Sequence, residues 1–156
     1  AVETGTGTIK RSHAEGLINE EVERARRYSR SATLVMMGPD DWEEIVNQRG
    51  AEAAEHLIAE VARSYIENVR SIDRIIHLNG PDFGALLPET NLEGAQVVAE
   101  KLCAAASELF GTQVRAGVAA FPEDDVTGQG LISEAEEALS FGRIAQITVA
   151  SRSLLT

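Results

Sequence analysis

The sequence predicts an α+β fold in which a central, mostly antiparallel sheet of about five strands is flanked by helices, a ferredoxin-like or palm arrangement. Stretches with helical spacing of apolar residues alternate with short apolar runs along 156 residues, which suffice for one domain with a single core. Two of the apolar runs, 74–78 and 83–87, are separated only by the turn residues Asn79-Gly80-Pro81-Asp82, which predicts a β-hairpin. A hairpin within a helix–strand alternation excludes an all-parallel sheet.

The first half of the chain is predicted to contain three helices and one strand. Residues 15–30 have apolar residues at helical spacing, and their charges run from acidic to basic, which suits the helix dipole. Residues 32–37 form a continuous apolar run and predict a buried strand. Asp40 is expected to cap a short helix over residues 40–48. Residues 51–69 have one apolar face and predict a long helix.

The second half continues the alternation after the hairpin. A helix is predicted over residues 92–110, followed by a strand over 113–121 that Pro122 ends. A further helix over 131–141 and a short last strand over 147–150 complete the domain. The order of elements is therefore compatible with a sheet covered by helices.

Composition limits the partners and the location of the chain. The net charge of −11 argues against nucleic-acid binding and against contact with an anionic membrane, so an anionic ligand would need a local cluster of Arg or Lys. No apolar stretch reaches the ~18 residues that span a bilayer. The single cysteine, Cys103, excludes an internal disulfide and suits a cytoplasmic protein. Residues 1–14, rich in Gly and Thr, are expected to be a flexible lead-in or linker, and 15–156 a single domain.

Several segments resemble the GGDEF, or diguanylate-cyclase-like, family. Residues 73–90 look like the family's stretch D-x-x-x-R-x-G-G-D-E-F-x-x-L-L-P-x-T. Residues 34–47 are similar to the strand and turn D-x-D-x-F-K-x-I-N-D, 116–119 to S-x-G-V-A, and 135–139 to A-D-x-A-L. Arg143 falls where the family has a Lys. The segments occur in the family's order, and the resemblance implies a nucleotidyl-cyclase-like palm fold and a role in cyclic di-GMP signalling.

The same resemblance indicates a degenerate catalytic site. The family holds its triphosphate and activates the 3′-hydroxyl with two metal-bound carboxylates. The first aligns with Gly38, and the first acidic position of the signature aligns with Pro81. The guanine-reading Asn and Asp align with Val46 and Glu55, and the phosphate-side Lys aligns with Glu43. The degenerate signature reads Asn79, Gly80, Pro81, Asp82, Phe83. We therefore expect neither catalysis nor a bound Mg²⁺ cofactor.

A product-binding motif of the family, R-x-x-D, is intact in Arg70-Ser71-Ile72-Asp73. Arg offers a planar fork to phosphate and to the guanine Hoogsteen edge, whereas a carboxylate accepts hydrogen bonds from guanine N1 and N2. Arg24 and Lys101 align with two further basic positions of the family. The resemblance thus predicts a cyclic di-GMP site formed by Arg70 and Asp73 and assisted by Arg24 and Lys101. An isolated Arg–Asp pair at a helix end is, however, usually no more than a solvated i,i+3 pair.

Three hypotheses about function remain open at this point. The leading one is a catalytically inactive receptor for cyclic di-GMP that acts on other domains of a longer chain, on a partner signalling protein or within a homodimer. The rival is a ligand-independent dimerisation or protein-interaction module that retains only the fold. The third is a weak residual cyclase that uses Asp40 and Asp82.

Four carboxylates in one short segment suggest a replacement metal site, but consecutive helix positions diverge, so a solvated helix start is expected. These residues are Asp40, Asp41, Glu43 and Glu44.

Overall fold

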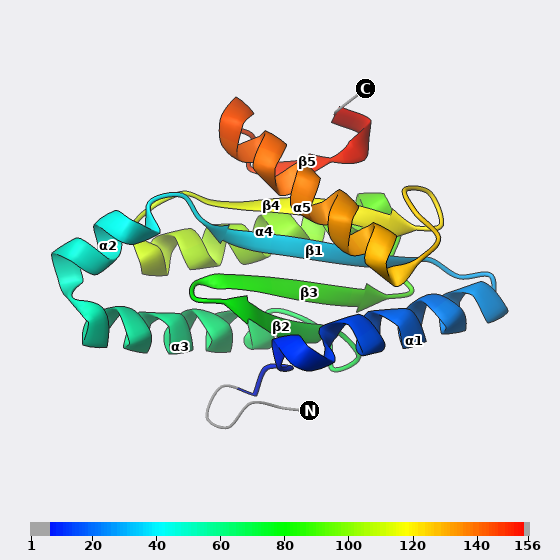
Figure 1. Cartoon of the computed structure of the whole chain (residues 1–156), viewed down its shortest axis with the longest axis horizontal. Coiled ribbons are helices and arrows are strands. Elements are labelled where there is room, and N and C mark those ends of the chain that lie inside the picture. Colours follow the sequence, from blue (N-terminus) through cyan, green and yellow to red (C-terminus); the bar gives the residue numbers. More distant parts are fainter. Residues whose placement is uncertain (1–6, 155–156) are drawn as a thin grey trace.

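The computed structural model describes residues 7–154 and contains one five-stranded sheet with the strand order β2-β3-β1-β4-β5 (Figure 1). Every neighbouring pair is antiparallel except β4–β5, which is parallel. The predicted α+β class with a mostly antiparallel sheet is confirmed. The strands are β1 (Ala32–Pro39), β2 (Arg74–Asn79), β3 (Asp82–Pro88), β4 (Val114–Phe121) and β5 (Val149–Ser151).

Helices cover both faces of the sheet. Leu34 and Met36 of β1 face the core that α1 and α5 cover, while Val35 and Met37 face the core that α3 and α4 cover, as the period of two in a strand requires. The helices are α1 (Ala14–Arg27), α2 (Trp42–Arg49), α3 (Ala51–Glu67), α4 (Leu92–Phe110) and α5 (Gly128–Ala145), with 3₁₀ turns at η1 (Arg11–His13) and η2 (Arg152–Leu154). Within residues 7–154, none of these helices has both the length and the apolarity that a bilayer crossing requires.

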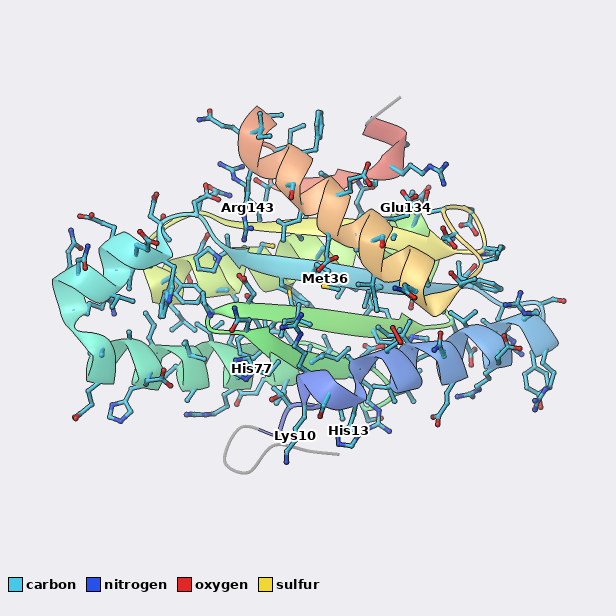
Figure 2. All side chains as sticks on the ribbon, in the orientation of Figure 1. Lys10, His13, Met36, His77, Glu134 and Arg143 are labelled. Atoms are coloured by element: carbon cyan, nitrogen blue, oxygen red, sulfur yellow. The ribbon has the colours of Figure 1, made fainter. Side chains whose placement is uncertain are left out.

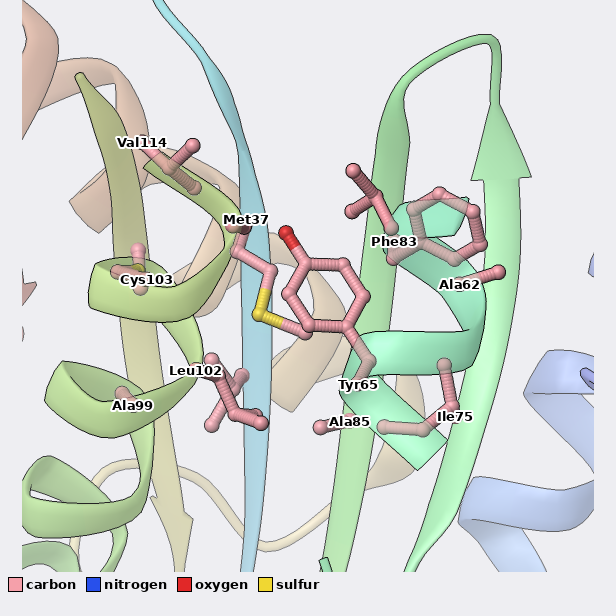
Figure 3. Packing of buried hydrophobic residues seen from close by; sticks show 14 of the residues in the cluster. Met37, Ala62, Tyr65, Ile75, Phe83, Ala85, Ala99, Leu102, Cys103 and Val114 are labelled. Atoms are coloured by element: carbon pink, nitrogen blue, oxygen red, sulfur yellow. The ribbon is translucent and has the colours of Figure 1, made fainter. Parts of the chain in front are cut away.

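Tyr65 of α3 lies at the centre of the α3–α4 core (Figure 3). Its ring meets Phe83 of β3 edge-on, with the ring centroids 5.4 Å apart. The hydroxyl is buried and has no hydrogen-bond partner in the described part of the chain. Cys103 of α4 is buried in the same core, where desolvation raises the pKa of its thiol to about 12. This thiol is therefore a small packing group.

Gly117 lets α5 lie close to the sheet. A side chain at position 117 would overlap the backbone of α5 at Ala135 and Leu139. Helix α5 also begins three residues before the predicted start, because the Thr127 side chain accepts a hydrogen bond from the Gly130 N–H. The close approach fixes α5 over β4 and thereby fixes the position of every residue that α5 contributes to a site.

Three predictions about local structure are wrong in detail. Helix α1 ends at Arg27 instead of Arg30, because Ser29 takes a left-handed backbone with φ of 53°. Tyr28, an apolar residue within the predicted helix 15–30, follows the end of α1 and is 60% exposed. Asp40 does not cap α2, which begins only at Trp42.

The predicted flexible lead-in is in part an ordered component of the domain. Ile9 is buried and forms a parallel β-bridge with Ile76 of the edge strand β2. The Ile9 N–H donates to the Ile75 carbonyl at 2.8 Å, and the Ile9 carbonyl accepts from His77 N–H at 2.9 Å. The domain thus begins before residue 15, since an apolar side chain and two backbone groups gain partners there. Residues 1–6 of the predicted lead-in lie outside the described residues.

Candidate functional site

The first candidate region is an acidic cleft where the end of β1 meets the β2–β3 hairpin. The cleft has a volume of about 670 Å³. Five of its lining residues are acidic, and Arg143 of α5 is the one basic residue among them. Its acidic lining residues are Asp40, Asp41, Glu43, Glu44 and Asp82, and the others besides Arg143 are Pro39, Trp42, Asn47, Asn79 and Pro81. A nucleoside triphosphate would meet a strongly negative lining here.

Asp82 fills the space that a side chain at position 38 would occupy. A Cβ built on Gly38 would overlap the Asp82 carboxylate and would lie 2.9 Å from Arg143 Nη2. The Asp82 carboxylate forms an ion pair with Arg143, with 3.6 Å between Oδ1 and Nη2. Burial raises the pKa of Asp82, and the neighbouring Arg143 opposes part of that rise. Figure 2 shows Arg143 near the C-terminal end of α5. The pair therefore links the hairpin tip to α5 across the end of β1.

Asp40 is bound to the neighbouring strand β4. Its two carboxylate oxygens accept hydrogen bonds from Arg115 Nε at 3.1 and 3.0 Å, and its N–H donates to the Gln113 carbonyl at 2.9 Å. Within residues 7–154, no three His, Cys, Asp or Glu side chains gather in a way that would hold a metal ion. The four carboxylates at the start of α2 thus do not converge.

The segment that aligns with the family's signature, residues 79–83, lies at the tip of the β2–β3 hairpin. Gly80 takes a left-handed backbone with φ of 53°, which allows the tight turn before Pro81. The Gly80 carbonyl lies 2.9 Å from His77 Nε2, and the His77 ring stacks on buried Phe83 at a centroid distance of 4.8 Å. These contacts of His77 fix the hairpin tip.

The second candidate region is the Arg70–Asp73 turn between α3 and β2, at the other end of the sheet. The Arg70 guanidinium donates two hydrogen bonds to the Asp73 carboxylate, from Nε to Oδ2 at 3.1 Å and from Nη2 to Oδ1 at 2.7 Å. Nη2 also lies 2.8 Å from the Pro88 carbonyl and 2.8 Å from Thr90 Oγ1. The hydrogen bond from Arg70 to Asp73 is the main cause that raises the pKa of Arg70. These hydrogen bonds hold the Arg70 side chain in one orientation and connect the turn to the end of β3.

The two members of this motif differ in exposure. The Asp73 side chain is only 2% exposed, whereas the Arg70 side chain is 51% exposed. Both Asp73 oxygens accept from Arg70, and Oδ2 also accepts from the Arg70 backbone N–H at 2.8 Å. A ligand can therefore reach Arg70 directly, but it can reach the Asp73 carboxylate only after the turn rearranges.

The structure places one of the two assisting basic residues near this turn. Arg24 of α1 lines a cleft of about 330 Å³ together with Ser71 and Ile72 of the motif. Lys101 belongs to α4, which packs on the opposite face of the sheet from α1. Of the four predicted residues, Arg70 and Asp73 contact each other, Arg24 lines a cleft with the two residues between them, and Lys101 lies on the other side of the sheet.

Sequence reasoning missed a further acidic residue beside Arg24. Glu89 follows β3, and its carboxylate lies 2.6 Å from Arg30 Nη1 and 3.9 Å from Arg24 Nη2. Arg30 is 59 residues away in the chain, so local patterns contain no signal for this contact. The family's pattern has an unspecified residue at this position, and only the fold reveals the cluster.

Comparison with known protein families agrees with the fold and with the position of the hairpin. The family model described as "Diguanylate cyclase, GGDEF domain" matches residues 2–143. The chain belongs to the GGDEF family. The resemblance seen in the sequence is confirmed at this level.

This chain matches only part of a longer relative in the family. The diguanylate cyclase DgcP of Pseudomonas aeruginosa is 27% identical over 142 residues, which are 86% of this chain and 21% of DgcP. This GGDEF domain therefore spans about a fifth of that relative.

Two solved GGDEF domains have the same fold. The domain of TpbB, also called YfiN, from Pseudomonas aeruginosa matches with a TM-score of 0.86 and 19% identity, over 97% of this chain and 93% of that one. The domain of DgcB from Caulobacter crescentus, solved in complex with c-di-GMP, matches with a TM-score of 0.86 and 14% identity, over 96% and 91%. At these identities the likeness shows the fold alone.

Proposed function

We propose that this GGDEF domain does not synthesise cyclic di-GMP and instead binds it at the Arg70–Asp73 turn as a cytoplasmic receptor. The main support for the absence of synthesis is the Asp82–Arg143 ion pair, which occupies the space above Gly38. A cyclase of this family needs a metal-bound carboxylate at that position and a second one at the hairpin tip. Here Gly38 and Pro81 have no side-chain oxygen to offer.

The residues of the acidic cleft do not fit a metal-chelated triphosphate. Asp40 is engaged by Arg115, and Asp82 by Arg143. Glu43 replaces a phosphate-side Lys and would repel the phosphates. Loss of a single transition-state contact commonly lowers kcat by a factor of roughly 10² to 10³, and several contacts are absent here. These features support the absence of cyclase activity.

The Arg70–Asp73 turn supports the receptor half of the proposal. Arg70 presents a half-exposed guanidinium whose orientation is already fixed by Asp73 and by the end of β3, so little rotamer entropy remains to be lost on binding. Arg24 lines a cleft together with Ser71 and Ile72, the two residues between Arg70 and Asp73. Cyclic di-GMP offers phosphates and guanine edges that match such donors. The DgcB domain, solved with this ligand, has the same fold.

Isothermal titration calorimetry with cyclic di-GMP tests the receptor role. We expect binding in the micromolar range or tighter, and we expect Arg70→Ala to abolish it, because that variant removes the phosphate fork. Arg63→Ala is the matched control, since Arg63 is an exposed arginine on α3 outside the turn. The absence of heat at high ligand concentration, with a folded protein, would exclude the receptor role.

One observation favours the second candidate function, a ligand-independent interaction module. The Asp73 carboxylate is buried and already accepts three hydrogen bonds from Arg70, so it is not free for guanine. This candidate predicts self-association or partner binding that Arg70→Ala leaves unchanged. Sedimentation of the wild-type domain and of Arg70→Ala, each with and without cyclic di-GMP, separates the two functions.

A further inference from the structure

Glu89 is the negative centre of a cluster of arginines from different parts of the chain. Its carboxylate lies 2.6 Å from Arg30 Nη1 and 3.9 Å from Arg24 Nη2. The neighbouring residue, Thr90, accepts a hydrogen bond from Arg70 Nη2 at 2.8 Å. Two guanidinium groups thus pair with Glu89 at the end of β3, and a third, that of Arg70, binds the residues on either side of it.

Two cavities meet at Glu89. The first has a volume of about 300 Å³ and is lined by Glu21, Arg24, Ala25, Tyr28, Arg30 and Glu89. The second has a volume of about 360 Å³ and contains Arg30, Glu89 and Thr90 in its lining. Both are large enough for a phosphate group, and in each the Glu89 carboxylate lines the cavity together with Arg30.

The backbone of Glu89 is unusual for a residue that has a side chain. Its φ of 51° lies in the left-handed region, which costs a non-glycine residue free energy. The surrounding contacts hold it there: the Arg30 ion pair on one side and the Arg70 hydrogen bonds to Pro88 and Thr90 on the other. The fold therefore fixes the backbone position from which the partly exposed Glu89 side chain reaches the arginines.

We propose that Glu89 is a built-in counter-anion that occupies the position a ligand phosphate would take beside Arg24 and Arg30, and that it thereby sets the affinity of the site. This inference rests on the proposed receptor function and deepens it. The ligand class is a phosphodiester or another compact phosphate that must displace the carboxylate before it reaches these two arginines.

The charges around the site support this role. Arg24, Arg30 and Arg70 contribute three positive charges, and Asp73, Glu89 and Glu21 contribute three negative ones. The pKa of Glu21 is raised, chiefly by burial and in smaller part by Glu89, while Arg24 opposes the rise. The cluster is thus neutral in total with Glu89 present and gains one positive charge without it.

Calorimetry on Glu89→Gln tests the inference with two probes, cyclic di-GMP and inorganic pyrophosphate. Glutamine keeps the size of the side chain and removes its charge. We expect Glu89→Gln to bind each probe roughly threefold to tenfold more tightly than the wild type, as one partly exposed charge pair is released. Glu134→Gln is the matched control, because Glu134 of α5 also pairs with an arginine, Arg152 at 3.7 Å, but lines neither cavity at Glu89 (Figure 2).

The two probes distinguish failure of this inference from failure of the proposed function. Tighter pyrophosphate binding by Glu89→Gln, with no cyclic di-GMP binding by any variant, supports the counter-anion role and excludes the receptor role. Cyclic di-GMP binding that is equal in the wild type and in Glu89→Gln overturns the counter-anion role and leaves the receptor role intact. The absence of binding of both probes to both proteins overturns both. Glu89→Gly, which also relieves the left-handed backbone, is expected to repeat the gain in affinity with no loss of stability.

Discussion

Asp82 and Gly38 illustrate how single residues alter the site. A glycine at the end of β1 leaves space, and a carboxylate from the hairpin enters that space and pairs with Arg143. The sequence alone predicts the missing carboxylates at Gly38 and Pro81, because those residue types have no side-chain oxygen. It does not predict that Asp82 turns inward, because that depends on the packing of α5 against the sheet.

The pKa of Asp82 leads to a prediction about stability and pH. Burial raises the pKa in the folded state above its ordinary value of 3.8, although Arg143 opposes the rise. The folded state therefore binds the proton more tightly than the unfolded state, and ionisation of Asp82 lowers stability as pH rises through this window. We expect Asp82→Asn to raise the unfolding free energy at pH 7 by less than about 1 kcal/mol, because the side chain is 40% exposed and solvent screens the effect.

Urea denaturation of the wild type and of Asp82→Asn at several pH values measures this difference. The advantage of the variant is expected to vanish below the ordinary Asp pKa, where the carboxyl is protonated in both states. A variant that is less stable than the wild type at neutral pH, and equal to it in acid, would show instead that the ion pair stabilises the fold.

The sequence predicted the type and order of the helices and strands better than it predicted the residues at which they begin and end. Periodic apolar residues are a local signal, so the five strands and five main helices occur in the predicted order. The ends depend on contacts that are distant in the chain. Arg115, 75 residues away, binds Asp40 and removes it from the cap of α2. The edge strand β2, more than 60 positions downstream, gives Ile9 a partner that the Gly/Thr-rich start of the chain does not suggest.

The segment around Ile9 protects the edge of the sheet at the signature hairpin. Ile9 is 5% exposed and bridges Ile76, with one hydrogen bond to each neighbour of Ile76 in β2. We expect Ile9→Ala to lower the unfolding free energy by about 2–3 kcal/mol, because a buried side chain leaves a cavity and the edge strand loses its cover. Guanidinium denaturation measures the loss.

Ile144→Ala provides the control for this prediction. Ile144 is 84% exposed, so the same truncation should change stability by no more than about 0.5 kcal/mol. Equal effects of the two substitutions would mean that the segment before α1 does not contribute to the fold.

At the scale of the whole molecule, β3 joins two regions of opposite chemistry. It begins at the acidic cleft with Asp82 and ends beside the arginine cluster around Glu89. The region expected to hold a triphosphate is strongly acidic, whereas at the opposite end of the sheet the arginines balance the neighbouring carboxylates. We therefore expect a phosphate ligand to meet less repulsion at the arginine cluster than at the acidic cleft.

A cyclase assay tests the central claim most directly. The domain, at a concentration at which two copies meet, is incubated with GTP and either Mg²⁺ or Mn²⁺, and the nucleotides are separated by chromatography. We expect GTP to remain and no cyclic di-GMP to form with either ion, because the carboxylates that would hold the metals are replaced by Gly38 and Pro81 and the remaining space is filled by the Asp82–Arg143 pair. Cyclic di-GMP that accumulates with time and in proportion to the protein would contradict this account.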